Sequence, residues 1–245
     1  MPLPDLFRPI VDFALPPRCP ICGVTVEADH RFCLDCWQQL SFIARPWCVG
    51  CGLPLAFDPA EESLCIDCLI DPPIHDGVRA VVRYDDRSSL IAMRLKYGNR
   101  LGLARLIAEH LQKFTVECPE NSIIVPVPLH HSRLWRRGFN QSILIGRELS
   151  RVTGIGMDYR VIYRSRITPP LRGMTGKQRR KTVDEAFLLR TDARARIGGK
   201  SILLVDDVYT SGSTSNACAR LLKKAGAERV LVFCWARVIS GFENS

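Results

Sequence analysis

Beyond about residue 75, apolar positions follow two alternating patterns along the chain. Short apolar runs predict strands at 78–84, 123–125, 159–163, 202–205 and 229–235. Between them, apolar residues at every third or fourth position predict helices at 88–98, 101–114, 140–153 and 214–225. Strands and helices that alternate in this way form a parallel sheet with right-handed crossovers. The pattern therefore predicts an α/β fold, a parallel sheet flanked by helices.

Residues 1–75 lack this periodicity and contain most of the cysteines. Eight of the eleven cysteines lie in this segment, as four Cys-x-x-Cys pairs: Cys19/Cys22, Cys33/Cys36, Cys48/Cys51 and Cys65/Cys68. We expect no secretion signal, because prolines and charges interrupt the start of the chain, and four such pairs then favour metal over disulfides. The sequence therefore predicts a small zinc-binding module over 1–75 and a second domain over 76–245.

Four thiolates complete one tetrahedral zinc site, so the four pairs can hold two Zn2+ ions. The simplest assignment is sequential, with the first two pairs on one ion and the last two on the other. A cross-braced pairing stays open, because spacing alone does not exclude it. Gly23 and Gly52 directly follow the second cysteine of a pair, where glycine allows a tight turn that points amides at sulfur. Because four thiolates leave no position for substrate, we expect both ions to be structural.

The net charge of +9 favours an anionic partner, either a phosphorylated small molecule or nucleic acid. Charge alone does not choose between them. Seven Lys and Arg residues lie between Arg164 and Lys181, with no acid among them. No apolar run approaches the length of a membrane span, and we expect a cytoplasmic protein.

The most informative stretch joins the strand at 202–205 to the helix at 214–225. Two acids, Asp206 and Asp207, follow the strand, where ligands bind in open parallel sheets, and they suit the hydroxyl groups of a sugar. Small hydroxyl residues then surround one glycine: Thr210, Ser211, Gly212, Ser213 and Thr214. The unpaired amides of a helix start suit a phosphate, and glycine lets the backbone approach it. The stretch predicts a site for ribose 5-phosphate; a plain strand–turn–helix with hydroxyl caps is the alternative.

This stretch resembles the PRPP (5-phosphoribosyl 1-pyrophosphate) signature of type I phosphoribosyltransferases. With the cysteine pairs, nearly the whole chain is similar to the ComF family, also called ComFC or GntX. Its other marks here are Leu95-Lys96-Tyr97-Gly98, Val125-Pro126-Val127-Pro128-Leu129, Arg137-Gly138-Phe139-Asn140-Gln141, and Arg179-Arg180 with Ala186-Phe187. Members usually carry Gln at the position of Leu171 and Asn at that of Thr182.

The resemblance implies a type I phosphoribosyltransferase-like sheet behind an N-terminal double zinc ribbon. It also implies that Asp206 and Asp207 bind the ribose hydroxyls and that Thr210 to Thr214 surround the 5-phosphate. The family is associated with natural competence, in which imported single-stranded DNA is handled on the cytoplasmic side, or with DNA utilisation. Mg2+ is expected with PRPP, held largely by PRPP oxygens and water.

Further candidate residues lie in basic loops. The segment 164–181, with Lys177 and Arg179 as its candidate catalytic cations, is placed to close over pyrophosphate. Arg137, in the loop after the strand at 123–125, is a candidate for the pyrophosphate side. His130 and His131 receive no role.

Three functions remain open from the sequence. The first is a phosphoribosyltransferase of unknown acceptor. The second is a non-catalytic PRPP sensor that uses the same pocket. The third is an adaptor that binds single-stranded DNA, with a protein of the competence machinery as a further candidate partner. The third is disfavoured because the basic residues gather beside the phosphate loop and lack interleaved aromatic residues for base stacking.

Overall fold

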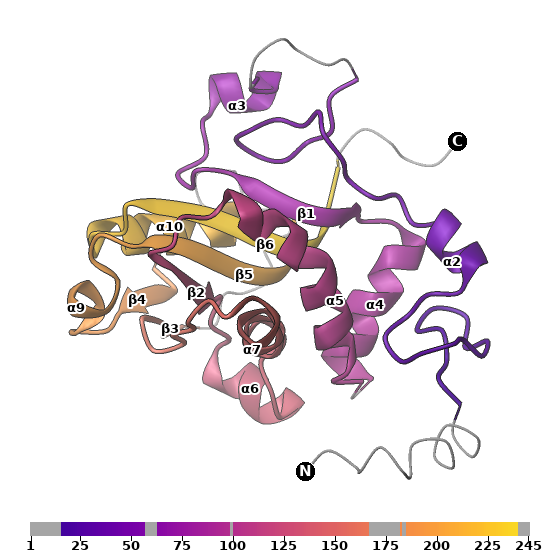
Figure 1. The fold of residues 1–245 in the computed structure, drawn as a ribbon. Coiled ribbons are helices and arrows are strands. Elements are labelled where there is room, and N and C mark those ends of the chain that lie inside the picture. Colours follow the sequence, from indigo (N-terminus) through magenta and orange to yellow (C-terminus); the bar gives the residue numbers. More distant parts are fainter. Residues whose placement is uncertain (1–15, 57–62, 99, 167–181, 183–184, 240–245) are drawn as a thin grey trace.

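The computed structural model describes residues 16–56, 63–98, 100–166, 182 and 185–239. Its centre is a four-stranded sheet of β1 (Val78–Arg83), β2 (Ser122–Pro126), β5 (Ser201–Tyr209) and β6 (Arg229–Arg237). The strand order is β1-β6-β5-β2 and all pairs are parallel (Figure 1). This arrangement confirms the parallel α/β sheet that the alternating pattern predicts.

One strand differs from its prediction. The strand expected at 159–163 begins later, as β3 (Ile162–Arg164), and pairs antiparallel with β4 (Phe187–Leu189), which the sequence analysis did not identify. These two short strands form a separate ribbon beside the main sheet. The predicted strand at 159–163 overlaps β3 only at Ile162 and Tyr163, because Tyr159 and Arg160 are exposed. Its partner β4 lies beyond the basic segment, where periodicity does not reveal it.

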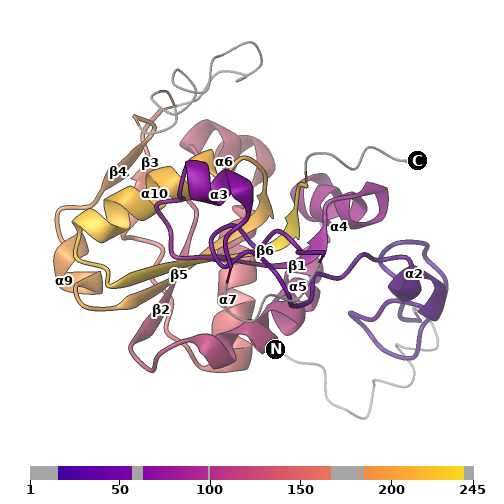
Figure 2. The same ribbon diagram turned by 90° about the horizontal axis from the view of Figure 1, so that it is seen from above.

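Helices cover both faces of the sheet (Figures 1 and 2). One face packs against α4 (Asp86–Tyr97), α5 (Leu103–Leu111) and α7 (Gln141–Thr153). The other face packs against α10 (Ser213–Lys224), α9 (Ala193–Ile197) and the β3–β4 ribbon. Side chains such as Leu106 of α5 and Leu222 of α10 are fully buried, and each contributes about 1.5–3 kcal/mol of burial free energy.

Local capping fixes where the helices begin. Asn140 accepts a hydrogen bond from the Ser142 amide at the start of α7, which ends at Gly154 with φ of +77°, as its sequence predicts. In α4, Asp85 is the cap and Ser88 reciprocates from the third helical position, so the helix begins before the predicted Ser88. The helix predicted at 101–114 divides into α5 and the 3-10 helix η2 (Gln112–Glu117).

The cysteine-rich segment wraps around this domain. It carries two short helices, α2 (Leu34–Gln38) and α3 (Ile66–Ile70), each starting directly after the third cysteine of its tetrad. Its middle part runs beside β1, where the Ile43 amide donates to the Val81 carbonyl at 2.9 Å and the Arg83 amide to the Ser41 carbonyl at 2.8 Å. Buried residues around Cys19 and Cys36 belong to the same hydrophobic core as one face of the sheet, whereas Cys48, Cys51 and Cys68 form a small buried cluster of their own. Within the described ranges, none of the helices is long and apolar enough to cross a membrane.

Candidate functional site: two thiolate tetrads and a loop at the sheet edge

The cysteine pairs form two compact tetrads. In each, all four sulfur atoms lie within 4.8 Å of one another; the tetrads are Cys19/Cys22/Cys33/Cys36 and Cys48/Cys51/Cys65/Cys68. The Sγ atoms of Cys22 and Cys33 are 3.6 Å apart, close to the spacing that four zinc bonds of about 2.3 Å impose on tetrahedral sulfurs. No described cysteine forms a disulfide, and four thiolates are a donor set that fits Zn2+. The grouping of the sulfur atoms is that of the sequential assignment.

The backbone around Cys48, the first cysteine of the second tetrad, is arranged to stabilise a thiolate. Gly52 has φ of +69°, and the Cys48 sulfur accepts hydrogen bonds from the amides of Cys51 at 3.4 Å and Cys65 at 3.3 Å. The Cys51 thiol and these amides together lower the pKa of Cys48 to about 4, although burial opposes the shift. A sulfur that is already ionised at neutral pH is a ready metal ligand.

The predicted phosphate loop lies at the carboxyl edge of the sheet. Strand β5 continues to Tyr209, so Asp206 and Asp207 belong to its last part, whereas the sequence predicted the strand to end at Val205. Gly212, with φ of +72°, then starts α10. Thr210 and Ser211 are exposed, and the hydroxyls of Ser211 and Ser213 are 3.0 Å apart. Because Gly212 has no side chain to cap the helix, the amides of the first turn remain available to an anion.

The two acids have different environments. Asp207 is buried, and its Oδ2 pairs with the Lys96 ammonium of α4 at 2.6 Å. The Oδ1 of Asp206 accepts hydrogen bonds from the Ser142 hydroxyl at 3.1 Å and the Asp207 amide at 2.9 Å. Burial, followed by the charge of Asp207, raises the pKa of Asp206 to about 7. The site therefore holds a carboxyl group whose pKa lies near neutrality, beside the ion pair of Asp207 and Lys96.

Arg137 is held beside this edge. It ends α6 (His131–Arg137), a helix in a segment that was expected to be a loop. Its guanidinium donates to the Tyr97 hydroxyl at 3.0 Å and to Gln141 at 3.3 Å, while its buried Nε has no hydrogen-bond partner among the described residues. The other two candidate catalytic cations, Lys177 and Arg179, lie outside the described residues.

Sequence reasoning did not assign a role to Lys96. Nothing in the helical pattern distinguishes it from a solvated lysine, and only the Leu95-Lys96-Tyr97-Gly98 mark pointed to this position. In the structure Lys96 forms an ion pair with Asp207, and the neighbouring Tyr97 hydroxyl accepts a hydrogen bond from the Arg137 guanidinium. The end of α4 therefore supplies one side of the site.

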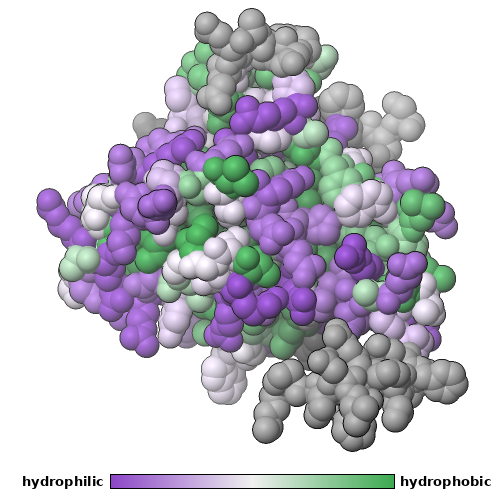
Figure 3. Space-filling view, viewed as in Figure 1, coloured by the Kyte–Doolittle hydropathy of each residue, from purple (hydrophilic) through white to green (hydrophobic). Residues whose placement is uncertain are grey.

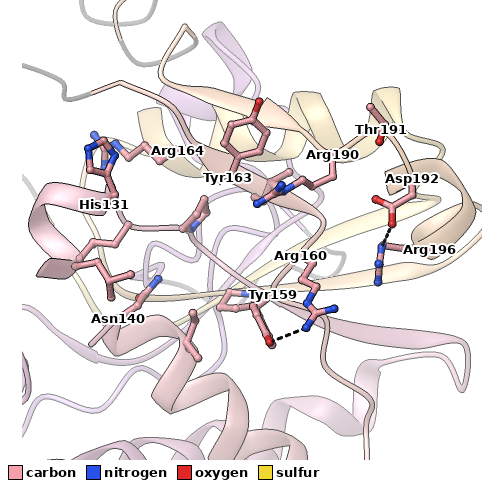
Figure 4. A pocket seen from close by; sticks show the side chains of 16 residues that line it. His131, Asn140, Tyr159, Arg160, Tyr163, Arg164, Arg190, Thr191, Asp192 and Arg196 are labelled. Atoms are coloured by element: carbon pink, nitrogen blue, oxygen red, sulfur yellow. Dashed lines mark hydrogen bonds and ion pairs between the residues drawn. The ribbon is translucent and has the colours of Figure 1, made fainter. Parts of the chain in front are cut away.

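A cavity of about 870 Å3, which the sequence did not predict, lies at the β2 edge of the sheet (Figure 4). Apolar side chains from β2, α7 and β3 form part of its lining, and in Figure 3 apolar surface shows between hydrophilic groups in this region. The Arg190 guanidinium lies 4.9 Å from the centre of the Tyr163 ring, and that of Arg160 lies 5.5 Å from the Tyr159 ring. The Arg196 guanidinium forms ion pairs with the carboxylates of Asp158, at 2.8 Å, and Asp192, at 2.7 Å.

Two known domain families match separate parts of the chain. The double zinc ribbon domain matches residues 10–69, and the phosphoribosyl transferase domain matches residues 155–244. Among solved structures, the glutamine PRPP amidotransferase from B. subtilis is 20% identical over 58% of this chain and 30% of its own, with a TM-score of 0.38.

Several relatives match nearly the whole chain. The chain is 32% identical over 227 residues to competence protein F of Haemophilus influenzae, and this match covers 90% of this chain and 96% of the relative. It is 29% identical over 233 residues to the DNA utilization protein YhgH of Escherichia coli K12, covering 92% and 99%. Competence protein ComFC of Bacillus subtilis is 28% identical, covering 86% of both chains. With its double zinc ribbon and its phosphoribosyltransferase fold, the chain belongs to the ComF family of competence and DNA utilization proteins.

Proposed function

We propose that the loop from Asp206 to Thr214 binds PRPP and that the protein transfers a 5-phosphoribosyl group. The observation that carries this proposal is the sequence of groups along one sheet edge: a titrating carboxyl, a carboxylate–ammonium pair, and then an open helix start behind Gly212. A phosphorylated pentose offers matching groups in the same order, because its hydroxyls need acceptors and its 5-phosphate needs amide donors.

In this proposal Asp206 and Asp207 accept hydrogen bonds from the ribose hydroxyls, and the residues from Thr210 to Thr214 bind the 5-phosphate. Mg2+, when bound with PRPP, would be held largely by PRPP oxygens and water and would neutralise charge on the pyrophosphate. Lys96 supplies a further cation at the sugar, and Arg137, held by Tyr97 and Gln141, supplies positive charge on the pyrophosphate side.

The transfer requires few chemical groups from the protein. The bond between the anomeric carbon and the pyrophosphate oxygen breaks, its electron pair leaves with pyrophosphate, and an acceptor forms the new bond to that carbon through an oxocarbenium-like transition state. Catalysis then depends on positioning and on charge neutralisation of the leaving group. Lys177 and Arg179 are proposed to complete that neutralisation from the basic segment.

The acceptor class separates an enzyme from a PRPP sensor. Release of pyrophosphate from PRPP should be followed with amines, nucleobases and oligonucleotides as acceptors, in wild type and in Asp206→Asn/Asp207→Asn. Acceptor-dependent release that the double variant abolishes supports the transferase. PRPP binding without release for any acceptor would favour the sensor.

The names of the relatives refer to competence and DNA utilization, and we extend this link to the present chain as a role in handling DNA or its components. A specific observation favours a second candidate function, binding of single-stranded nucleic acid. The sequence argument against it was a lack of aromatic residues among the basic ones, yet Tyr159 and Tyr163 lie against Arg160 and Arg190 in the cavity of Figure 4. Arginines beside aromatic rings suit phosphates and stacked bases.

Fluorescence anisotropy with a labelled oligonucleotide tests this second function. Arg160→Ala/Arg190→Ala should weaken single-strand binding about tenfold or more, since two guanidinium–phosphate contacts are lost. Arg105→Ala is the matched control, because Arg105 pairs with Glu109 on α5 away from the cavity. Equal affinities for all three proteins would exclude the cavity as the binding surface.

A further inference from the structure

The second cysteine tetrad is connected to the phosphate loop through Arg237. This residue ends β6, and its buried guanidinium reaches the zinc module. Its Nε donates to the Cys51 carbonyl at 2.6 Å, and its Nη2 donates to the Cys51 sulfur at 3.0 Å. Because the donor is charged and the contact is sheltered from water, these bonds are strong ones. The position of Arg237 therefore depends on the position of Cys51.

Arg237 in turn supports Tyr209, the last residue of β5. The two residues are register partners in the parallel sheet, and the guanidinium lies 5.7 Å from the centre of the Tyr209 ring. The Tyr209 hydroxyl is hydrogen-bonded to buried His75 at 3.1 Å. His75 lies on the segment that leads from the tetrad to β1.

The ring of Tyr209 lies directly under the turn that starts α10. A Cβ atom added to Gly212 would collide with the Tyr209 hydroxyl, so no gap separates the ring from this turn. The segment that leads from the second tetrad to β1 also contacts the first turn of α10, because the Ile74 amide donates to Asn216 Oδ1 at 2.8 Å. Two independent connections thus run from the second tetrad to the loop, one beneath Gly212 and one on Asn216.

The first tetrad has a different neighbour. Arg94 of α4 donates to the carbonyls of Pro20 and Ile21, a guanidinium-to-carbonyl contact like that of Arg237 on Cys51. Among the hydrogen bonds that the structure shows for its described residues, none joins this tetrad to the segment 210–216. The two tetrads are therefore not equivalent with respect to the phosphate loop.

We propose that zinc in the second tetrad fixes the phosphate loop through Arg237, Tyr209 and His75, so that these three are positioning residues for the 5-phosphate. The proposal rests on the proposed PRPP site. The metal would hold the Cys51 sulfur and carbonyl at one place, and the rigid contacts beneath Gly212 would transmit that placement to the amides of the first turn of α10. Positioning matters here because displacements near 1 Å weaken such sites strongly.

The test compares matched variants of the two tetrads. Cys65→Ser/Cys68→Ser removes the second zinc site, and Cys33→Ser/Cys36→Ser removes the first; mass spectrometry should find one zinc ion per chain in each, against two in wild type. By calorimetry, the second-tetrad variant should bind ribose 5-phosphate about tenfold or more weakly, and the first-tetrad variant within about threefold of wild type. Equal losses in both variants, or no loss in either, would overturn the proposal.

Two further measurements cover the case in which a cysteine variant does not fold. Arg237→Gln, with Arg94→Gln as its counterpart, should lose affinity for ribose 5-phosphate while both zinc ions remain. Hydrogen exchange of the amides at 210–216 should accelerate in Arg237→Gln and stay unchanged in Arg94→Gln. Unchanged exchange in Arg237→Gln would refute the connection. If wild type itself fails to bind ribose 5-phosphate, the proposed function fails, whereas the exchange experiment still decides the connection separately.

Discussion

Asp206 should make the protein less stable as the pH rises toward neutrality, and Asp206→Asn should remove that effect. Burial and the adjacent Asp207 charge raise the pKa of Asp206 from 3.8 to about 7. Between these values the folded chain holds a proton that the unfolded chain has released. Stability therefore falls as pH rises through this window, and the cost is complete above pH 7. The slope is about 1.4 kcal/mol per pH unit, or roughly 4 kcal/mol over the full window.

Denaturant unfolding at pH 5, 6, 7 and 8, with zinc kept in excess, measures this cost. The free energy of unfolding of Asp206→Asn minus that of wild type should rise by about 1.4 kcal/mol per pH unit between pH 5 and 7 and then level off. Taking the difference cancels the pH dependence of zinc binding. Asp192→Asn is the control: a hydrogen bond from Arg196 lowers the pKa of Asp192, so its difference should stay flat above pH 5. A flat line for Asp206→Asn would show that this carboxyl is not desolvated.

Three other outcomes follow from the same structure. Gly212→Ala should cost about 1–3 kcal/mol in chemical denaturation, because its φ of +72° and the Tyr209 hydroxyl both oppose a Cβ; adding Tyr209→Phe should restore part of the loss, and no rescue would remove Tyr209 from the account. Lys96→Met should destabilise the fold by on the order of 2–4 kcal/mol and weaken PRPP binding in calorimetry, since it leaves the buried Asp207 carboxylate unpaired; wild-type affinity in this variant would contradict the site. Arg179→Ala/Arg180→Ala should weaken pyrophosphate binding more than ribose 5-phosphate binding, and equal losses would refute a pyrophosphate-binding segment.

The sequence predicts features that depend on neighbouring residues. The start of α7 at Asn140 and its end at Gly154 follow from short-range capping chemistry, which operates within a few residues. The cysteine pairs indicate two metal sites for the same reason. The helix start behind Gly212 also appears where expected. In each case the residues that form the feature are close together in the chain.

The remaining features depend on contacts between distant segments. Strands β3 and β4 pair across the basic segment, and each is only three residues long, so neither has a distinctive period. Arg237 looks like an ordinary residue at the end of a buried strand, and its contact with Cys51 spans 186 positions in sequence. The arginine–tyrosine cavity likewise combines α6, α7, β3 and the segment before α9. Tertiary packing decides these contacts, and sequence pattern alone does not contain it.

Calorimetry with PRPP and Mg2+ on wild type and on Asp206→Asn/Asp207→Asn addresses the proposed site most directly. The two amides keep the size of the carboxyl groups and remove their charge, and zinc content and circular dichroism establish that the variant is folded. We predict saturable binding to wild type and a loss of about a hundredfold or more in the variant, because each carboxylate bond to a sugar hydroxyl contributes about 1.5–3 kcal/mol. The same affinity in both proteins would contradict the assignment of a PRPP site to this edge of the sheet.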